Sequence, residues 1–549
     1  MPRKHRPLRP REPKACTACA RLKVRCEVPT GTKICTRCLR LNRECIVQAP
    51  GAHKRVDAVG RDSSDVARLE ERLDSISAAF TAQTPLSIQT PLDERSRDSN
   101  SILANDLPTN LEAQTLLTTF QIELSPYFPF ITIPMGTTAS DLQASNPFLF
   151  DAILMVSDVS NADRQLRMAR RIREVIGTSV VANGEMGLDL LQGLLVCLAW
   201  YQFQLELGSW FGGFLHVALG MLRGLGWDRK PLRGRMSMVR LDDVRQDTAG
   251  QAGERSLDER RVYLGCFYLS AVASVCTADI DPMRYTEYTE ECCCLLESAG
   301  GSTDLYLVRL IRLHRMVKRI DCMIPLDKYA SSRESSTPIS TRIKTFEAEL
   351  QEMKQKQPPH NLHDSILQLH HFTLEIKLHG IALEDDFPQH ETHPSTRLIL
   401  LASCTNATKA FLDLFSAIPT RNYLNLSYPV WSAYFYVLGT LSNLLLFAGE
   451  GWDREHVQSV LDLQDIIEAS IAKIEDSSRN RHQNLYQFPE ALVRLVPRLR
   501  AFDEAYRARL ATPIGTELHG HQCEDSATDD ARDIMFPLPH GFSWRFLQH

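Results

Sequence analysis

The sequence of 549 residues lacks the short motifs that mark common enzyme classes. It has no G-x-S-x-G elbow, no G-x-x-x-x-G-K-[ST] phosphate loop, no G-x-G-x-x-G dinucleotide loop and no H-E-x-x-H zinc helix. Its first residues are the basic stretch Pro2-Arg3-Lys4-His5-Arg6 instead of an apolar leader, so we expect no secretory signal peptide. We therefore expect a protein that is not an enzyme and whose 15 cysteines are kept reduced.

Long apolar runs are also scarce. Residues 430–448 are the one uncharged stretch with the length of a membrane span, and serine, threonine, glycine and asparagine interrupt it. We predict a buried central helix at this stretch and expect no membrane partner.

The overall formal charge of −5 is small, but its distribution is uneven. Residues 1–62 contain 16 lysines and arginines against five acidic side chains, so the rest of the chain is acidic. Such an asymmetry predicts a short polyanion-binding head on an acidic body. A head this short needs a metal, disulfides or a partner to fold.

Six cysteines in the head repeat one pattern, C-x2-C-x6-C, twice; they are Cys16, Cys19, Cys26, Cys35, Cys38 and Cys45. Zinc prefers four tetrahedral ligands, and thiolates suit it. Two ions need eight ligand positions, which six sulfurs supply only if two of them bridge. Three disulfides or scattered structural cysteines are the alternatives, but the duplicated spacing favours a metal cluster.

The residues that carry this pattern resemble the fungal binuclear zinc cluster of transcription regulators. The match runs through Cys16-Thr17-Ala18-Cys19-Ala20-Arg21-Leu22-Lys23-Val24-Arg25-Cys26, Pro29 and Cys35-Thr36-Arg37-Cys38. The resemblance implies two zinc ions per chain, with Cys16 and Cys35 as bridging ligands. It implies a DNA-binding domain at residues 16–45, preceded by a basic arm at residues 1–15.

The same resemblance implies which basic residues meet DNA. Lys23 matches the lysine that contacts guanine in CGG-type triplets, a chemistry that O6 and N7 of guanine support. Phosphate contacts are expected from Arg21, Arg25, Arg37, Arg40 and Arg43. The alternative is that these side chains form a solvated charged face.

A short heptad pattern follows a linker at residues 46–64. Residues 65–80 carry apolar side chains at alternating spacings of three and four, namely Val66, Leu69, Leu73, Ile76 and Phe80. We predict a coiled coil that makes a homodimer, against the alternative of an amphipathic helix packed on the body. Residues 81–110 are predicted to be a flexible spacer.

Residues 111–511 predict one large all-α domain, because their apolar residues recur with helical spacing. The predicted helices span residues 111–123, 147–159, 165–176, 187–207, 213–225, 257–275, 304–323, 340–356, 365–379, 395–418, 430–448, 454–475 and 489–509. Residues 190–203, 226–228 and 258–268 resemble the fungal-specific regulatory region, which implies that this body holds the protein inactive or responds to a small-molecule effector. Residues 512–549 mix acidic and bulky apolar side chains. They are either an activation segment that binds co-activators or the transcription machinery, or a tail whose aromatic side chains pack on the body.

The sequence therefore predicts a nuclear, zinc-dependent transcription factor that binds specific double-stranded DNA as a homodimer and regulates RNA polymerase II genes. The resemblance suggests control of a metabolic or secondary-metabolite gene cluster. The first alternative is a metabolite-binding or scaffold co-regulator whose zinc module binds no specific DNA. A zinc enzyme is the second alternative, but it would need an open coordination position. Cys292, Cys293 and Cys294 are either a thiol site or an ordinary cluster in a loop or the interior.

Overall fold

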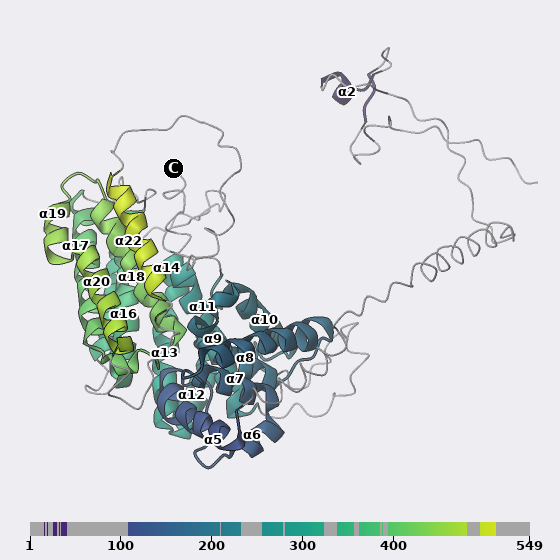
Figure 1. Ribbon diagram of the computed structural model, residues 1–549. Coiled ribbons are helices and arrows are strands. Elements are labelled where there is room, and N and C mark those ends of the chain that lie inside the picture. Colours follow the sequence, from purple (N-terminus) through teal and green to yellow (C-terminus); the bar gives the residue numbers. More distant parts are fainter. Residues whose placement is uncertain are drawn as a thin grey trace, which may run out of the picture. The chain divides into compact units, whose positions relative to one another are not determined.

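The computed structural model describes two compact units, Met1–Ser99 and Asn100–His549, shown in Figure 1. In the first unit it describes Cys16, Cys19, residues 26–29, Thr32, residues 34–40 and Cys45. In the second it describes residues 108–208, 210–231, 255–277, 280–322, 338–355, 362–384, 387, 394–479, 493 and 495–511. The predicted coiled coil at residues 65–80 and the tail at residues 512–549 lie outside the described residues.

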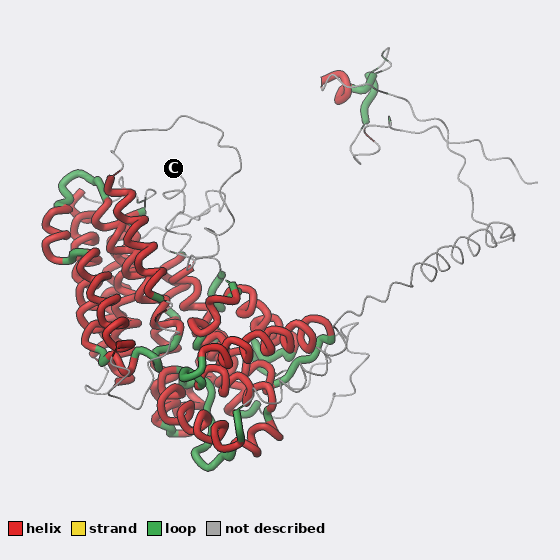
Figure 2. Tube along the Cα trace, in the orientation of Figure 1, coloured by secondary structure: helices red, strands yellow, loops and turns green. Residues whose placement is uncertain are grey.

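The described part of the second unit, which we call the body, consists of helices joined by loops and contains no strand (Figure 2). The prediction of a mostly helical body is confirmed. The α-helices are α5 (Asn110–Thr119), α6 (Ala139–Ser145), α7 (Pro147–Ser157), α8 (Ala162–Val175), α9 (Leu188–Ala199), α10 (Phe211–Gly224), α11 (Leu257–Thr277), α12 (Glu287–Ala299), α13 (Ser302–His314), α14 (Met316–Asp321), α15 (Ile339–Gln355), α16 (Leu362–Gly380), α17 (Pro394–Ala417), α18 (Tyr428–Leu446), α19 (Arg454–Val460), α20 (Leu463–Arg479) and α22 (Val496–Ala511).

Local side-chain hydrogen bonds set where several helices begin. At the start of α5, the Thr109 hydroxyl accepts the N–H of Glu112, and the Glu112 carboxylate accepts the N–H of Thr109 at 2.7 Å. Ser256 and Glu259 make the same reciprocal pair before α11. Each pair satisfies backbone donors that the first helical turn leaves without partners.

Three predictions of a continuous helix are wrong, because the structure divides each of these segments into two shorter elements. The helix predicted at residues 187–207 ends at Ala199 and continues as the 3₁₀-helix η4 (Tyr201–Leu207). The reason is tertiary, because the side chains of Trp200 and Gln202 donate to the carbonyls of Asn425 and Leu426 at 3.3 and 3.0 Å. These partners are 225 and 224 residues away in the sequence, and helical periodicity carries no information about them.

The helix predicted at residues 304–323 is divided into α13 and α14 at Arg315. The helix predicted at residues 454–475 is divided into α19 and α20. There the Asp462 carboxylate accepts the N–H groups of Gln464 and Asp465 at 2.9 and 3.1 Å and starts a new helix. The sequence also missed α6 and α12.

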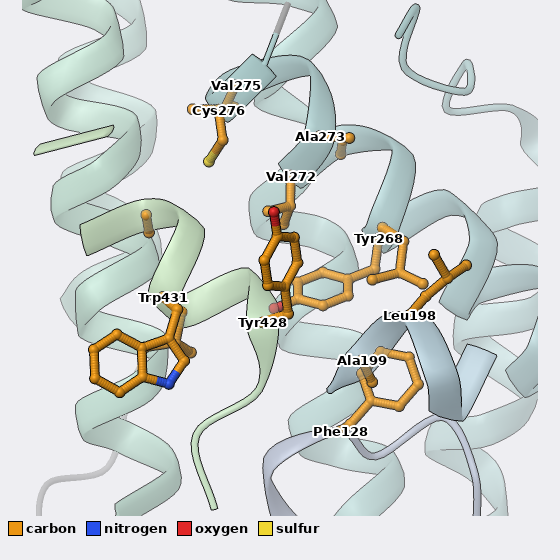
Figure 3. Close-up of a cluster of buried hydrophobic side chains, with 14 of the residues drawn as sticks. Phe128, Leu198, Ala199, Tyr268, Val272, Ala273, Val275, Cys276, Tyr428 and Trp431 are labelled. Atoms are coloured by element: carbon orange, nitrogen blue, oxygen red, sulfur yellow. The ribbon is translucent and has the colours of Figure 1, made fainter. Parts of the chain in front are cut away.

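The core brings together helices from both ends of the body. Figure 3 shows aromatic side chains of α18, among them Tyr428 and Trp431, beside side chains of α9 and α11. The Phe128 ring lies 6.3 Å from that of Tyr268 and 6.1 Å from that of Trp200. Nearly every residue of α18 is buried, so the prediction of a buried helix at residues 430–448 is confirmed.

One helix among the described residues is long and apolar enough to cross a membrane by length and composition alone. It spans Ser395–Ala417 in α17, and half of its most apolar window is buried inside the body. α17 packs along α16, and Leu401 and Phe411 are fully buried. Core helices of this kind pass the same test, so the finding is weak evidence for a membrane span.

Three histidines lie inside the core around Tyr268 of α11. The Tyr268 hydroxyl is 2.9 Å from Nε2 of His370, and the rings of His370 and His314 are 4.9 Å apart. His371 is fully buried, and both of its ring nitrogens lack a hydrogen-bond partner in the described part of the chain. Burial lowers the pKa of His314 and of His371 to about 4, so the folded body holds both rings neutral at pH 7.

Candidate metal centre

The six cysteines of the N-terminal pattern come together in the first unit. The Sγ atom of Cys35 lies 3.9 Å from that of Cys16 and 3.8 Å from that of Cys19, and the Sγ atoms of Cys16 and Cys38 are also 3.8 Å apart. Four of the six side chains are buried, and Cys26 and Cys45 pack against them at the edge. None of the six is in a disulfide.

These sulfurs form two overlapping groups of four. One group holds Cys16, Cys19, Cys26 and Cys35, and the other holds Cys16, Cys35, Cys38 and Cys45. Within each group all Sγ atoms lie within 4.8 Å of one another. Cys16 and Cys35 are the two sulfurs that belong to both groups.

The two halves repeat each other with an offset of 19 residues, from Cys16, Cys19 and Cys26 to Cys35, Cys38 and Cys45. Their hydrogen bonds repeat as well. The N–H of Cys16 donates to Sγ of Cys26, and the N–H of Cys35 donates to Sγ of Cys45, both at 3.4 Å. The N–H of Cys19 donates to Sγ of Cys16 at 3.5 Å, and its counterpart Cys38 donates to Cys35 at 3.4 Å. The two halves of the site therefore repeat each other in hydrogen bonding as well as in sequence.

The shared pair differs from its neighbours in acidity. The backbone N–H of Cys38 lowers the pKa of the Cys35 thiol to about 6, and the N–H of Cys19 lowers the pKa of Cys16. Burial raises the pKa of Cys19 to about 12. The two thiols common to both groups therefore ionise most readily, which is the state a metal requires.

The sulfur spacing fits tetrahedral zinc. A Zn–S bond of about 2.3 Å in a regular tetrahedron places neighbouring sulfurs about 3.8 Å apart. The Sγ–Sγ distances of 3.9 Å (Cys16–Cys35), 3.8 Å (Cys16–Cys38) and 3.8 Å (Cys19–Cys35) match this edge. The cysteine groups could therefore hold metal ions, and their all-sulfur donor set is consistent with zinc.

The loop between the two halves is fixed by backbone and hydroxyl bonds. The N–H and the hydroxyl of Thr36 both donate to the carbonyl of Glu27, at 3.0 and 2.9 Å. This contact starts the short helix α2 (Thr36–Arg40), which carries Cys38. Of the predicted phosphate-contacting residues, Arg37 is half-buried and Arg40 is exposed on this helix.

The remaining predicted DNA contacts, Lys23, Arg21, Arg25 and Arg43, lie outside the described residues. So do all five predicted dimerisation residues: Val66, Leu69, Leu73, Ile76 and Phe80. Their roles remain predictions.

The three consecutive cysteines of the body lie on helix α12, so a loop position for them is wrong. Cys292 and Cys293 are buried, and Cys294 is exposed. Burial raises the pKa of Cys292 and Cys293, which makes them weak nucleophiles. In the described part of the chain, only the two N-terminal cysteine groups have the geometry of a metal site.

Comparison with known proteins places the chain in a family. A family model described as the WAR1 C-terminal domain matches residues 65–445. This match covers more than half of the sequence, and the chain belongs to that family. The matched residues begin after the cysteine cluster.

The chain is also similar to several fungal proteins. It is 27% identical to "Transcription factor opdL" of Penicillium oxalicum over 494 residues, which cover 86% of each chain. It is 29% identical to "Transcription factor himD" of Aspergillus japonicus over 84% of this chain and 79% of that one. It is 26% identical to "Transcription factor pbcR" of Emericella nidulans over 60% of this chain and 49% of that one. These relationships support a fungal transcription regulator and imply a role without catalysis.

Proposed function

We propose that this chain is a zinc-dependent, sequence-specific transcription factor of the fungal binuclear zinc cluster type. In this proposal the N-terminal unit binds two zinc ions and double-stranded DNA in the nucleus. The helical body regulates its activity, in response to a small-molecule effector, at RNA polymerase II promoters. The resemblance to the fungal zinc cluster family favours target genes that belong to a metabolic or secondary-metabolite gene cluster.

The observation that carries the proposal is the sharing of Cys16 and Cys35 by two groups of four sulfurs. Six thiolates satisfy two tetrahedral ions only when two sulfurs bridge, and this arrangement leaves no open position for a substrate. The zinc ions would supply folding free energy to a segment too short to have a core of its own. The site thus favours a structural cluster over a catalytic one.

The head also carries the charge that DNA binding needs. Lysines and arginines exceed acidic residues by 11 in residues 1–62, and the described helix α2 presents Arg37 and Arg40 beside the cluster. Positive side chains on a compact metal module favour contacts with the phosphate backbone. In this proposal Lys23 contacts the bases, and residues 65–80 pair two modules into a dimer.

The decisive experiment selects bound duplexes from a random pool with the full-length chain and zinc, at about 150 mM salt, because affinity for DNA depends on salt. We expect enrichment of two CGG-type triplets at a fixed spacing. The double variant Cys16→Ser/Cys35→Ser should enrich nothing, whereas Cys294→Ser, an exposed cysteine outside the cluster, should behave as the parent chain does.

The outcomes separate the parts of the proposal. Enrichment of a single triplet would support a DNA-binding regulator and contradict the proposed homodimer. Zinc-loaded protein that enriches no sequence would favour the alternative of a metabolite-binding or scaffold co-regulator.

A further inference from the structure

Two arginines, the buried Arg260 and the half-buried Arg255, lie where α10 ends and α11 and α12 begin, and neither contacts a carboxylate in the described part of the chain. Arg260 is 7% exposed; its Nε donates to the carbonyl of Arg255 at 3.3 Å, and its Nη1 lies 3.7 Å from Sγ of Cys292. Arg255 donates through Nη2 to the carbonyls of Gly226 and Arg229 at 2.5 and 3.0 Å. Its Nε is buried and has no hydrogen-bond partner among the described residues.

The acidic side chains near this corner are engaged elsewhere. Glu259 accepts the N–H of Ser256 at 2.8 Å. The other two carboxylates form ion pairs of 2.7 Å each, Asp258 with Arg261 and Glu291 with Lys230. Arg261 also pairs with Asp304 at 2.8 Å, so two carboxylates share one arginine, and Glu259 forms no ion pair in the described part of the chain. The charges of the corner are therefore close to balanced, and what Arg255 and Arg260 lack is strong hydrogen-bond acceptors.

Tyr288 of α12 adds a third donor. Its ring packs 5.0 Å from the ring of Tyr263, and the Arg255 guanidinium lies 5.8 Å from its centroid. The side chain is 6% exposed, and the partner of its hydroxyl among the described residues is the thiol of Cys292, a weak acceptor that also faces Arg260. Burial raises the pKa of Tyr288, so the hydroxyl keeps its proton and can donate.

We propose that Arg255, Arg260 and Tyr288 bind a compact tetrahedral oxyanion, such as inorganic phosphate or a phosphate monoester. The two guanidinium groups offer only donors, the tyrosine hydroxyl can donate as well, and such an anion offers acceptors. The thiol of Cys292 is a weak acceptor and leaves the hydrogen-bonding capacity of Arg260 largely unused. A phosphate group offers these donors three or four acceptor oxygens, whereas a carboxylate offers two.

This inference goes beyond the proposed function and does not rest on it, since no residue of the corner belongs to the cysteine cluster. It gives the regulatory body a ligand of defined chemistry. A bound anion would join α11 to α12, because Arg255 and Arg260 flank the start of α11 and Tyr288 lies on α12.

The test measures the unfolding temperature of the full-length, zinc-loaded chain against rising concentrations of inorganic phosphate. Sodium chloride at equal ionic strength is the reference, and phenyl phosphate and acetate are the two comparison anions. A ligand that binds only the folded state raises the unfolding temperature in a saturable way. We expect such a rise with inorganic phosphate or phenyl phosphate, with the better of the two identifying the source, and none with acetate.

Two variants assign the effect to this corner. Tyr288→Phe removes a hydroxyl that meets only the weakly accepting thiol of Cys292, so it should change the stability of the ligand-free chain little while weakening phosphate binding. Arg260→Gln should weaken binding about tenfold to a hundredfold, the range for loss of a charge-assisted hydrogen bond. Arg500→Gln, which breaks an exposed pair with Glu475 on α20, should bind as the parent chain does.

A phosphate effect no larger than that of sodium chloride would overturn the proposal. So would a full effect in both Tyr288→Phe and Arg260→Gln, because binding would then occur elsewhere. A saturable effect of acetate alone would contradict the assigned ligand class. If Arg260→Gln fails to fold, Tyr288→Phe decides the question alone.

Discussion

The Sγ atoms of Cys16 and Cys35 lie 3.9 Å apart and are the two sulfurs that both four-cysteine groups contain. Each accepts an N–H from the cysteine three residues later in the chain. This equivalence divides the six cysteines into two kinds, a shared pair and four that belong to one group each. The two kinds should respond differently to substitution.

Replacement of a shared cysteine should lower the zinc content of the chain more than replacement of a cysteine that belongs to one group. Cys35→Ser removes a ligand from both groups, so the chain should lose nearly all of its zinc. Cys45→Ser removes a ligand from one group, so about half should remain. Zinc per chain, measured by elemental analysis of purified protein, checks this, with Cys294→Ser as the matched control. Equal losses in Cys35→Ser and Cys45→Ser would contradict a shared ligand.

Removal of metal should affect the two units differently. If the head is the proposed zinc module, metal ligation supplies its folding free energy, so chelation should abolish DNA binding. The helical signal in far-ultraviolet circular dichroism should stay almost unchanged, because the six cysteines form a cluster separate from the core of the body. Re-addition of zinc should restore binding. A collapse of helicity on chelation would show that the body depends on the metal.

Replacement of Lys23 should reduce discrimination between sites. Lys23→Ala should cost about 1–3 kcal/mol on the preferred triplet and less on a mutated one, as loss of a base contact does. Arg40→Ala, at an exposed helical position, should weaken both duplexes by similar factors. Titration of both duplexes at one salt concentration measures the difference. Equal losses for the two substitutions would argue against a base contact by Lys23.

Charges in the heptad seam should separate metal binding from pairing. Leu69→Glu/Leu73→Glu should retain the full zinc content, bind a single half-site as before and lose affinity for a duplex with two half-sites. Glu70→Gln, outside the seam, is the matched control. Zinc analysis and titration of both duplexes test this. Unchanged affinity for the duplex with two half-sites would contradict the predicted coiled coil.

Acid should destabilise the body through its buried histidines. The folded pKa of His371 is about 4, below its usual value of 6.5, so the unfolded chain binds a proton that the folded chain excludes between these values. Stability is complete above pH 6.5 and falls as the pH drops towards 4, by about 2 kcal/mol at pH 5 for this residue.

The variant His371→Leu tests this origin. Leucine has a similar volume and brings no buried nitrogen atoms, so the variant should be at least as stable at pH 7.5 and clearly more stable at pH 5. Urea unfolding of the parent and the variant at both values measures the effect. The same loss of stability between pH 7.5 and pH 5 in both chains would rule out His371 as its source.

The sequence predicted the helical body and the six cysteines that meet, because helical periodicity and cysteine spacing are local signals. It could not predict the end of α9, where Trp200 and Gln202 take partners at Asn425 and Leu426. It missed α12 because Glu290, Glu291 and three cysteines gave no clear apolar pattern.

The sequence also gave no sign of the corner formed by Arg255, Arg260 and Tyr288. Single basic residues at a helix start look like a solvated face, and only the fold shows that Arg255 and Arg260 meet backbone carbonyls and a thiol. The only available signal was Arg260 on the same helix as the otherwise apolar run from Val262 onwards. Periodicity reports which residues are inside, but it does not report which buried donors have strong acceptors.

The hydrogen bonds from Arg255 to the carbonyls of Gly226 and Arg229 bear on which changes in chain length this protein can tolerate during evolution. Gly226 and Arg229 follow the end of α10, and Arg255 comes two residues before the start of α11, so one arginine side chain holds these two points of the chain together. Because the two points are held by this contact, a change in the length of chain between them should cost little entropy.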